Sequence, residues 1–218
     1  MSTARSAGLL LLIVSVAIVS CSGGKEKEED IFASSHPDSV LVRMERAWEG
    51  RDLAMYGSRV LYDGATPDAE GKTHGAFVFY HKGANQVAEP LYGYDQEMKV
   101  TEAMFAGKVK EQRTPPIRSI DLDIERRGDW KALPAGEMAL DDPCPSGTQS
   151  CLFNGMLRLT FEDALPGTDD NHYQVQHHGT LYVIPVQITD RSEDPVVEYR
   201  IWKWVDEGRT ETTPVEEL

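Results

Sequence analysis

The pattern of apolar and polar residues divides the chain into an uncharged start, a charged connection and a long mixed segment. Residues 8–19 (GLLLLIVSVAIV) carry no charge, and Arg5 precedes them. Such a run is typical of a secretion signal, and it is shorter than the roughly 20 apolar residues that a membrane-spanning helix needs. Residues 22–30 have nothing apolar to bury and predict a flexible tether over 21–34.

Helical periodicity follows the tether. One helical face is formed by apolar residues at suitable spacing, namely Val40, Leu41, Met44, Ala47 and Trp48. This spacing predicts an amphipathic helix that ends at Gly50. Asp52 is a suitable N-cap for a second short helix, and residues 96–106 predict a third.

The second half of the chain alternates with a period of two, which predicts strands. These strands cover 117–124, 156–161, 173–188 and 199–205, and a further short strand covers 77–80. Gly179 interrupts the third of them, so we expect a bend or bulge there. Together, early helices and a later antiparallel sheet predict one α+β domain over 35–208 and a disordered tail over 209–218.

The alternation in the last strand predicts which residues share a face. Ile201 and Lys203 fall on one face, whereas Trp202 and Trp204 fall on the other. Because Tyr199 adds an aromatic ring to the first face, both faces carry aromatic residues. The strand is therefore expected to be covered on both sides. The two tryptophans could stack a flat ligand or fill a core.

The four residues that end the apolar start, Ile18-Val19-Ser20-Cys21, resemble the lipobox of bacterial lipoproteins. The resemblance implies cleavage of a signal peptide over 1–20, a diacylglyceryl thioether on Cys21 and a fatty acid such as palmitate on the new amine. Ser22 resembles the pattern of lipoproteins sorted to the outer membrane. We therefore expect a cell-envelope protein whose membrane partner is its own lipid. The alternative is an ordinary secretion signal with an incidental cysteine.

The charge balance narrows the classes of partner. The chain has 36 acidic and 22 basic residues and a net charge of −14. This argues against nucleic acid and against electrostatic docking on anionic lipid. We find no glycine-rich phosphate loop, serine elbow or metal-ligand quartet, so the sequence predicts no cofactor and no metal.

Cys144 and Cys151 lie in a turn-rich stretch, residues 142–151. In an oxidising compartment this arrangement predicts a disulfide bond between them. A metal pair is the alternative, but no histidine or further cysteine lies nearby to complete a tetrahedral site.

Three segments together resemble the nuclear-transport-factor-two-like superfamily, which includes ketosteroid-isomerase-like and polyketide-cyclase-like proteins. They are residues 51–56, residues 94–98 leading to 104–105, and residues 199–207. The resemblance implies helices packed in a strongly curved antiparallel sheet, which forms a cone with an internal pocket. Residues 65–90 and the loop around Cys144 exceed a minimal cone and would be insertions.

Enzymes of that superfamily place an aspartate or a histidine–aspartate pair in the cone to move a proton beside a carbonyl. The corresponding candidates here are His177, His178, Asp121 and Asp123. Only one of the two adjacent histidines can point inward, and alternation with Val175 favours His177 unless Gly179 resets the phase. The plainer interpretation is that the histidines are edge or core residues and that both aspartates lie on a solvated strand face.

Two functional hypotheses follow from these residues. The first is a non-enzymatic, lipid-anchored domain that binds a small apolar molecule or a protein partner. The second is a small-molecule isomerase or dehydratase with a histidine or aspartate base. A buried histidine–aspartate pair in a closed cavity would favour the second hypothesis, and a filled cone would favour the first.

Overall fold

The computed structural model describes residues 35–82, 87–107, 115–188 and 196–211. The predicted signal peptide, the predicted tether and Cys21 lie outside these ranges. Among the described residues, every helix is too short or too polar to pass through a bilayer. The elements follow in the order α2 (Asp38–Glu49), α3 (Leu53–Met55), the π-helix η1 (Tyr56–Val60), β1 (Val78–Lys82), β2 (Ala88–Gly93), α4 (Tyr94–Phe105), β3 (Ile117–Ala132), β4 (Met138–Ala139), β5 (Asp142–Pro143), β6 (Gln149–Phe161), β7 (His172–Ile188) and β8 (Val196–Glu211).

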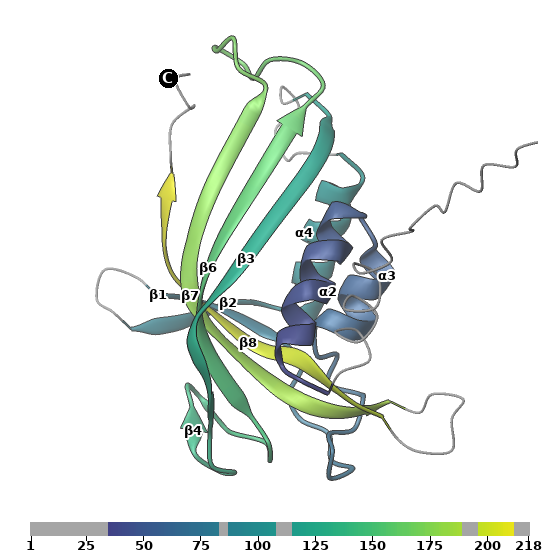
Figure 1. The fold of residues 1–218 in the computed structure, drawn as a ribbon, viewed down its shortest axis with the longest axis vertical. Coiled ribbons are helices and arrows are strands. Elements are labelled where there is room, and N and C mark those ends of the chain that lie inside the picture. The colour runs from purple at the N-terminus through teal and green to yellow at the C-terminus, as the bar shows by residue number, and fades with distance from the viewer. Residues whose placement is uncertain (1–34, 83–86, 108–114, 189–195, 212–218) are drawn as a thin grey trace, which may run out of the picture.

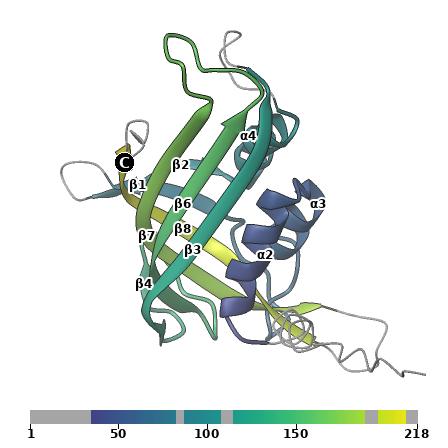
Figure 2. The same ribbon diagram turned by 45° about the horizontal axis from the view of Figure 1, so that its top comes forward.

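A six-stranded sheet in the order β2-β1-β8-β7-β6-β3 forms the body of the domain. Its long strands curve strongly, and all the labelled helices lie on the inner side of the curve (Figure 1), which a second view confirms (Figure 2). The predicted α+β class with a curved sheet around helices is therefore confirmed. The last strand runs to Glu211, beyond the predicted domain end at residue 208.

Two features of the sheet differ from the prediction. Strands β1 and β2 precede α4, and β1 pairs with β8 in parallel, so the sheet is not a purely antiparallel meander. Residues 65–90, expected to be an insertion, in fact supply β1 and part of β2 to the sheet edge. The local pattern could not reveal this, because the pairing partner β8 lies at the far end of the sequence.

The predicted helix signals are confirmed at both ends of the helical segment. The N–H of Gly50 bonds Arg46 O at 2.8 Å and closes α2. The side chain of Asp52 accepts a hydrogen bond from Met55 N at 2.8 Å and begins α3. Trp48, Tyr56 and Phe105 then join α2, η1 and α4 through ring contacts with centroids 5.8–6.4 Å apart, of which the two to Trp48 are edge-on. These rings form the centre of the main core.

Strand β8 lies between two cores, as its sequence predicted. The main core covers its inner face, and a second cluster covers its outer face. That second cluster contains Tyr62, Ala139, Cys144, Ile184, Val186 and Trp202. The bulge predicted near Gly179 is present as a register shift between His178 and Gly179.

The predicted division of β8 into two faces is wrong at Trp202. Tyr182 pairs with Lys203 but Val183 pairs with Ile201, so Trp202 is the extra residue of a second bulge. A bulge moves the alternation by one residue. As a result, Ile201 and Trp204 pack in the main core, while Trp202 belongs to the second cluster.

The predicted disulfide is also corrected. Both cysteines are buried free thiols. Cys151 packs in the main core, whereas Cys144 packs in the second cluster on the opposite face of the sheet. Burial raises the pKa of the Cys151 thiol to about 12 and also raises the pKa of Cys144. Spacing along the chain placed the two residues close together, but the sheet separates their side chains.

A buried lysine holds the β4–β5 hairpin over the outer face. Lys203 Nζ donates to Ala139 O at 2.8 Å and lies 2.9 Å from the Asp142 carboxylate. It also lies 4.5 Å from the centroid of the Trp202 ring. Because the ammonium is fully buried, these partners replace its hydration. The segment around Cys144 therefore covers the second cluster.

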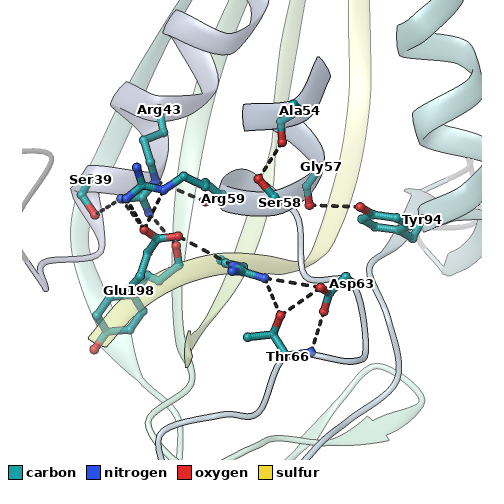
Figure 3. A network of polar contacts seen from close by, with 12 residues as sticks. Ser39, Arg43, Ala54, Gly57, Ser58, Arg59, Asp63, Thr66, Tyr94 and Glu198 are labelled. Carbon is teal, nitrogen blue, oxygen red and sulfur yellow. Dashed lines mark hydrogen bonds and ion pairs between the residues drawn. The ribbon is translucent and has the colours of Figure 1, made fainter. Parts of the chain in front are cut away.

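A buried carboxylate connects the helices to the start of β8. Arg59 Nη2 lies 2.7 Å from Glu198 Oε2, and Arg43 Nη1 lies 3.8 Å from the same oxygen (Figure 3). Arg200 Nε lies 3.7 Å from the other oxygen, Glu198 Oε1. Burial lowers the pKa of Arg43 to about 10, and the charge of Glu198 opposes that shift. Glu198 is therefore the anion around which three cations gather.

Glu97 on α4 is a second buried carboxylate, and it leads to a prediction about pH. Tyr56 Oη donates to its Oε1 at 2.7 Å and Thr101 Oγ1 donates to the same oxygen at 3.2 Å. Burial raises the Glu97 pKa above its ordinary value of 4.5, although these hydrogen bonds oppose the shift. Since the folded pKa is the higher one, the contribution of Glu97 to stability is greatest below pH 4.5 and falls as the pH rises toward the folded pKa.

Glu97→Gln keeps the accepting oxygen and removes the buried charge. We expect this variant to raise Tm by about 2–4 °C at pH 8, the shift that corresponds to about 1 kcal/mol in a domain of this size, and to leave Tm unchanged at pH 4. Thermal denaturation followed by circular dichroism at both pH values measures the effect. Glu102→Gln on the exposed side of α4 is the control and should change neither value. A lower Tm for Glu97→Gln at pH 8 would contradict the assignment.

Candidate functional site

Four aromatic side chains form a continuous row across the inner face of the sheet. Tyr92 on β2 stacks on Phe79 on β1, with ring centroids 4.9 Å apart. The ring centroids of Phe79 and Trp204 on β8 are 5.7 Å apart. The ring of Trp204 in turn meets that of Phe153 on β6 edge-on, with centroids 5.2 Å apart. This aromatic row belongs to the main core, on the face where the resemblance implies a pocket. Tyr92 and Trp204 remain partly exposed, so one side of the row is accessible.

A polar row runs beside the aromatic row, one step further along the strands. Its members are His81, Asp206 and His177, on β1, β8 and β7. The Nδ1 of His81 lies 3.7 Å from Asp206 Oδ2, and the Nδ1 of His177 lies 3.9 Å from Asp206 Oδ1. Exposure rises from 1% for the Asp206 side chain to 19% for His177 and 50% for His81. The row therefore opens to solvent at His81 and is buried at its central carboxylate.

Glycines shape the space between the two rows. A Cβ at Gly155 would lie 3.4 Å from Phe153 Cε2 and 3.8 Å from His177 Cβ, and a Cβ at Gly179 would lie 2.9 Å from Phe153 Cε1. The Phe153 ring thus lies over both glycine positions. The absence of side chains at these two positions leaves room for this ring against β6 and β7.

Two buried nitrogen atoms in this region have no hydrogen-bond partner among the described residues. They are His177 Nδ1 and Trp204 Nε1. Buried polar atoms are nearly always hydrogen-bonded to protein or to another molecule, because leaving one unsatisfied costs about 1–3 kcal/mol. These atoms are therefore suited to bind a polar group of a molecule that lies against the aromatic row.

The structure places the predicted candidates on opposite faces of the sheet. His177 points inward, as its alternation with Val175 predicted. Asp121 points outward and forms an exposed ion pair with Arg158 at 2.8 Å. His178 also points outward, where its Nδ1 lies 2.9 Å from Asn154 Oδ1. Asp121 is therefore not brought to His177, because the two residues lie on different sides of the sheet.

The carboxylate that does approach His177 is Asp206, which is not among the candidates predicted from the sequence. Asp206 follows Trp204 by two residues, and His81 follows Phe79 by the same interval. Both intervals are the spacing of residues on one strand face. This signal was present in the sequence, but it became informative only once β1 and β8 were known to be neighbours.

A metal is not indicated in the part of the chain that the structure describes. Within those ranges, no three histidine, cysteine, aspartate or glutamate side chains are grouped so that they could hold an ion. The chemistry that the polar row can perform is hydrogen bonding and acceptance of a proton by His177, with Asp206 beside it to stabilise the resulting charge.

No protein-family model and no curated protein matches this chain. Solved structures that are similar to it include the following two. One is a nuclear transport factor 2 (NTF2-like) superfamily protein from Salmonella enterica serovar Typhimurium, with 13% identity over 90% of this chain and 100% of that chain and a TM-score of 0.36. The other is ActVI-ORFA from Streptomyces coelicolor, with 14% identity over 79% of this chain and 92% of that chain and a TM-score of 0.35. The sequence identities and TM-scores are too low to transfer the role of any residue from these two proteins. The roles of individual residues are therefore inferred from the geometry of this chain alone.

Proposed function

We propose that this protein is a lipid-anchored envelope protein whose curved domain binds a small, largely apolar molecule on its inner face. The anchor rests on the lipobox-like Ile18-Val19-Ser20-Cys21, with two or more acyl chains needed for stable attachment. Residues 21–34 then tether the domain that begins with α2. A position in the outer membrane follows from Ser22 by the same resemblance.

The observation that carries the binding function is the pair of unsatisfied buried nitrogens, His177 Nδ1 and Trp204 Nε1, beside the aromatic row. Trp204 Nε1 is a donor, so the ligand presents an oxygen acceptor. The partly exposed rings of Trp204 and Tyr92 supply flat apolar surface for the rest of the ligand. The buried carboxylate of Asp206 disfavours an anionic ligand. A neutral, flat molecule with a carbonyl or hydroxyl oxygen satisfies all these conditions.

A neutral fluorescent ketone, 6-propionyl-2-(dimethylamino)naphthalene, tests this site. We expect its emission to shift to the blue on binding to the chain that begins at Ser22, which lacks the acylated cysteine. Trp204→Phe keeps an aromatic ring at this position but removes the indole N–H donor. This variant should bind the ketone about three- to tenfold more weakly, the loss expected for one hydrogen bond. The matched control is Trp202→Phe, since Trp202 lies on the opposite face and donates to Gly75 O at 3.0 Å.

Equal binding by the wild type and Trp204→Phe would exclude the inner site, and so would equal losses in the two variants. If the probe does not bind at all and the anchored protein instead retains another envelope protein through this face, the protein-partner form of the hypothesis is the correct one.

The second candidate function, an isomerase or dehydratase, is favoured by the approach of His177 Nδ1 to Asp206 Oδ1 at 3.9 Å. In that case His177 would take a proton from the carbon beside the ligand carbonyl and return one to it. The same ketone distinguishes the two functions, because its methylene beside the carbonyl would exchange hydrogen for deuterium in D₂O only if the protein catalyses this transfer. Exchange that His177→Gln abolishes would establish the enzymatic function, while binding without exchange supports the binding function.

A further inference from the structure

A separate cavity lies on the outer face of the sheet, on the side away from the polar row. It has a volume of about 190 Å³ and lies between β3, β6 and β7. Its lining consists of Asp123, Glu125, Asn154, Gly155, Met156, Gln176 and His178. The strand register arranges six of these residues in two adjacent rows, Asp123–Met156–Gln176 and Glu125–Asn154–His178. The cavity is therefore built from regular cross-strand neighbours.

The two carboxylates of the cavity, Asp123 and Glu125, differ from the neighbouring Asp121, whose charge is balanced by an ion pair with Arg158. Asp121 pairs with Arg158, but the next outward residues on β3, Asp123 and Glu125, face Met156 and Asn154 across the strands. Across the described ranges, no ion pair joins either of these two carboxylates to a cationic side chain. Two negative charges thus line a cavity with neutral opposite walls.

A third carboxylate strengthens the negative field at this edge of the sheet. Glu45 on α2 accepts a hydrogen bond from Ile124 N at 2.8 Å, which caps the exposed edge of β3. Burial raises the pKa of Glu45, and the neighbouring charges of Asp123 and Asp121 add to that shift while the Ile124 hydrogen bond opposes it. A cation in the cavity would reduce the repulsion among these groups.

The neutral lining residues add a further acceptor. Asn154 Oδ1 lies 2.9 Å from His178 Nδ1, and because an amide oxygen only accepts, His178 donates through Nδ1. The Nε2 of the neutral imidazole is then an acceptor. Met156 supplies apolar surface for a short hydrocarbon chain. The cavity therefore combines two carboxylates, an imidazole acceptor and a thioether.

We infer that this outer cavity binds a small organic cation with an alkylammonium group, held by Asp123 and Glu125. Its volume lies below the roughly 300–1,000 Å³ of sites for drug-sized ligands, which suits a ligand of only a few heavy atoms. An ammonium group supplies three donors to the acceptors, and a net charge of −14 attracts the cation to the protein. The inference does not depend on the inner site, which lies on the opposite face.

Titration of the full chain with putrescine, in low-salt buffer with a neutral detergent, tests the inference by calorimetry. We expect binding that added sodium chloride weakens, and no binding of the uncharged analogue 1,4-butanediol. The double variant Asp123→Asn/Glu125→Gln should bind putrescine at least about tenfold more weakly, since both charge-assisted contacts are lost. The matched control is Asp121→Asn, which removes a charge from the same face of β3 outside the cavity and should bind within about twofold of the wild type.

Three results would overturn the inference. They are the absence of putrescine binding, equal losses in the double variant and in Asp121→Asn, and tighter binding of calcium than of putrescine at the same residues. The three substituted residues are exposed, so their variants should keep the wild-type thermal unfolding curve. Trp204→Phe should leave putrescine binding unchanged, which separates failure at this cavity from failure at the inner site.

Discussion

Glu198→Ala is expected to lower the free energy of unfolding by about 3–5 kcal/mol, the cost of removing one partner from a buried ion pair. Arg43 is 1% exposed and Arg200 is 6% exposed, and both lie within 4 Å of the Glu198 carboxylate. Without that carboxylate, two buried guanidinium groups and the nearby Arg59 have lost their shared anion. The remaining hydrogen bonds of Arg43, to Ser39 Oγ, Arg59 O and Tyr199 O, do not remove its charge.

Urea denaturation followed by tryptophan fluorescence measures the loss for Glu198→Ala. The control is Glu207→Gln on the same strand, where the carboxylate is a third exposed and pairs with Lys82 at 3.3 Å. An exposed pair of that kind contributes at most about 1 kcal/mol. If both variants lose the same small amount, the Glu198 cluster does not hold the helices to β8 as described.

Gly179→Ala is the second substitution with a large expected effect, a loss of about 3 kcal/mol. A Cβ at this position would overlap Val205 O and would lie 2.9 Å from Phe153 Cε1. The first contact is with the backbone of the neighbouring strand β8, so the strands themselves would have to move apart. Such a shift disturbs the bulge between His178 and Gly179 and the Phe153 ring above it.

Gly155→Ala provides the matched control, because it adds the same methyl group one strand away. Its Cβ would meet Phe153 Cε2 at 3.4 Å, an ordinary contact. We expect a change within about 1 kcal/mol for this variant, and an unchanged m value for both variants in urea denaturation. A Gly179→Ala protein as stable as Gly155→Ala would show that β8 lies further from Gly179 than the structure places it.

Local features of the fold were predicted where neighbouring residues decide the outcome. Helix α2 and the Asp52 cap followed from spacing and capping chemistry, and the bulge at Gly179 followed from a glycine within an alternating run. The inward direction of His177 followed from the same alternation. In each of these places, the physical cause lies within a few residues of its effect.

Errors arose where one inserted residue or one distant strand decided the outcome. The bulge at Trp202 separated two tryptophans that simple alternation placed together. The disulfide between Cys144 and Cys151 was expected from their spacing, yet spacing does not say on which face of a sheet each thiol lies. Asp121 was chosen as a partner for His177 because it lies on a strand, but its ion pair with Arg158 is on the outer face.

The amino-acid sequence alone therefore specified the helices, the strand-rich second half and the two covered faces of β8, because each depends on local pattern. Lipid attachment at Cys21 is a prediction that rests on a short motif. The order of the strands and their register determined which residues form the inner polar row and the outer cavity. They brought His81 and Asp206 beside His177, and they aligned Asp123 and Glu125 with Asn154 and His178. These contacts join residues far apart in the chain, so they exist only after hydrogen bonding between strands has fixed which residues face each other.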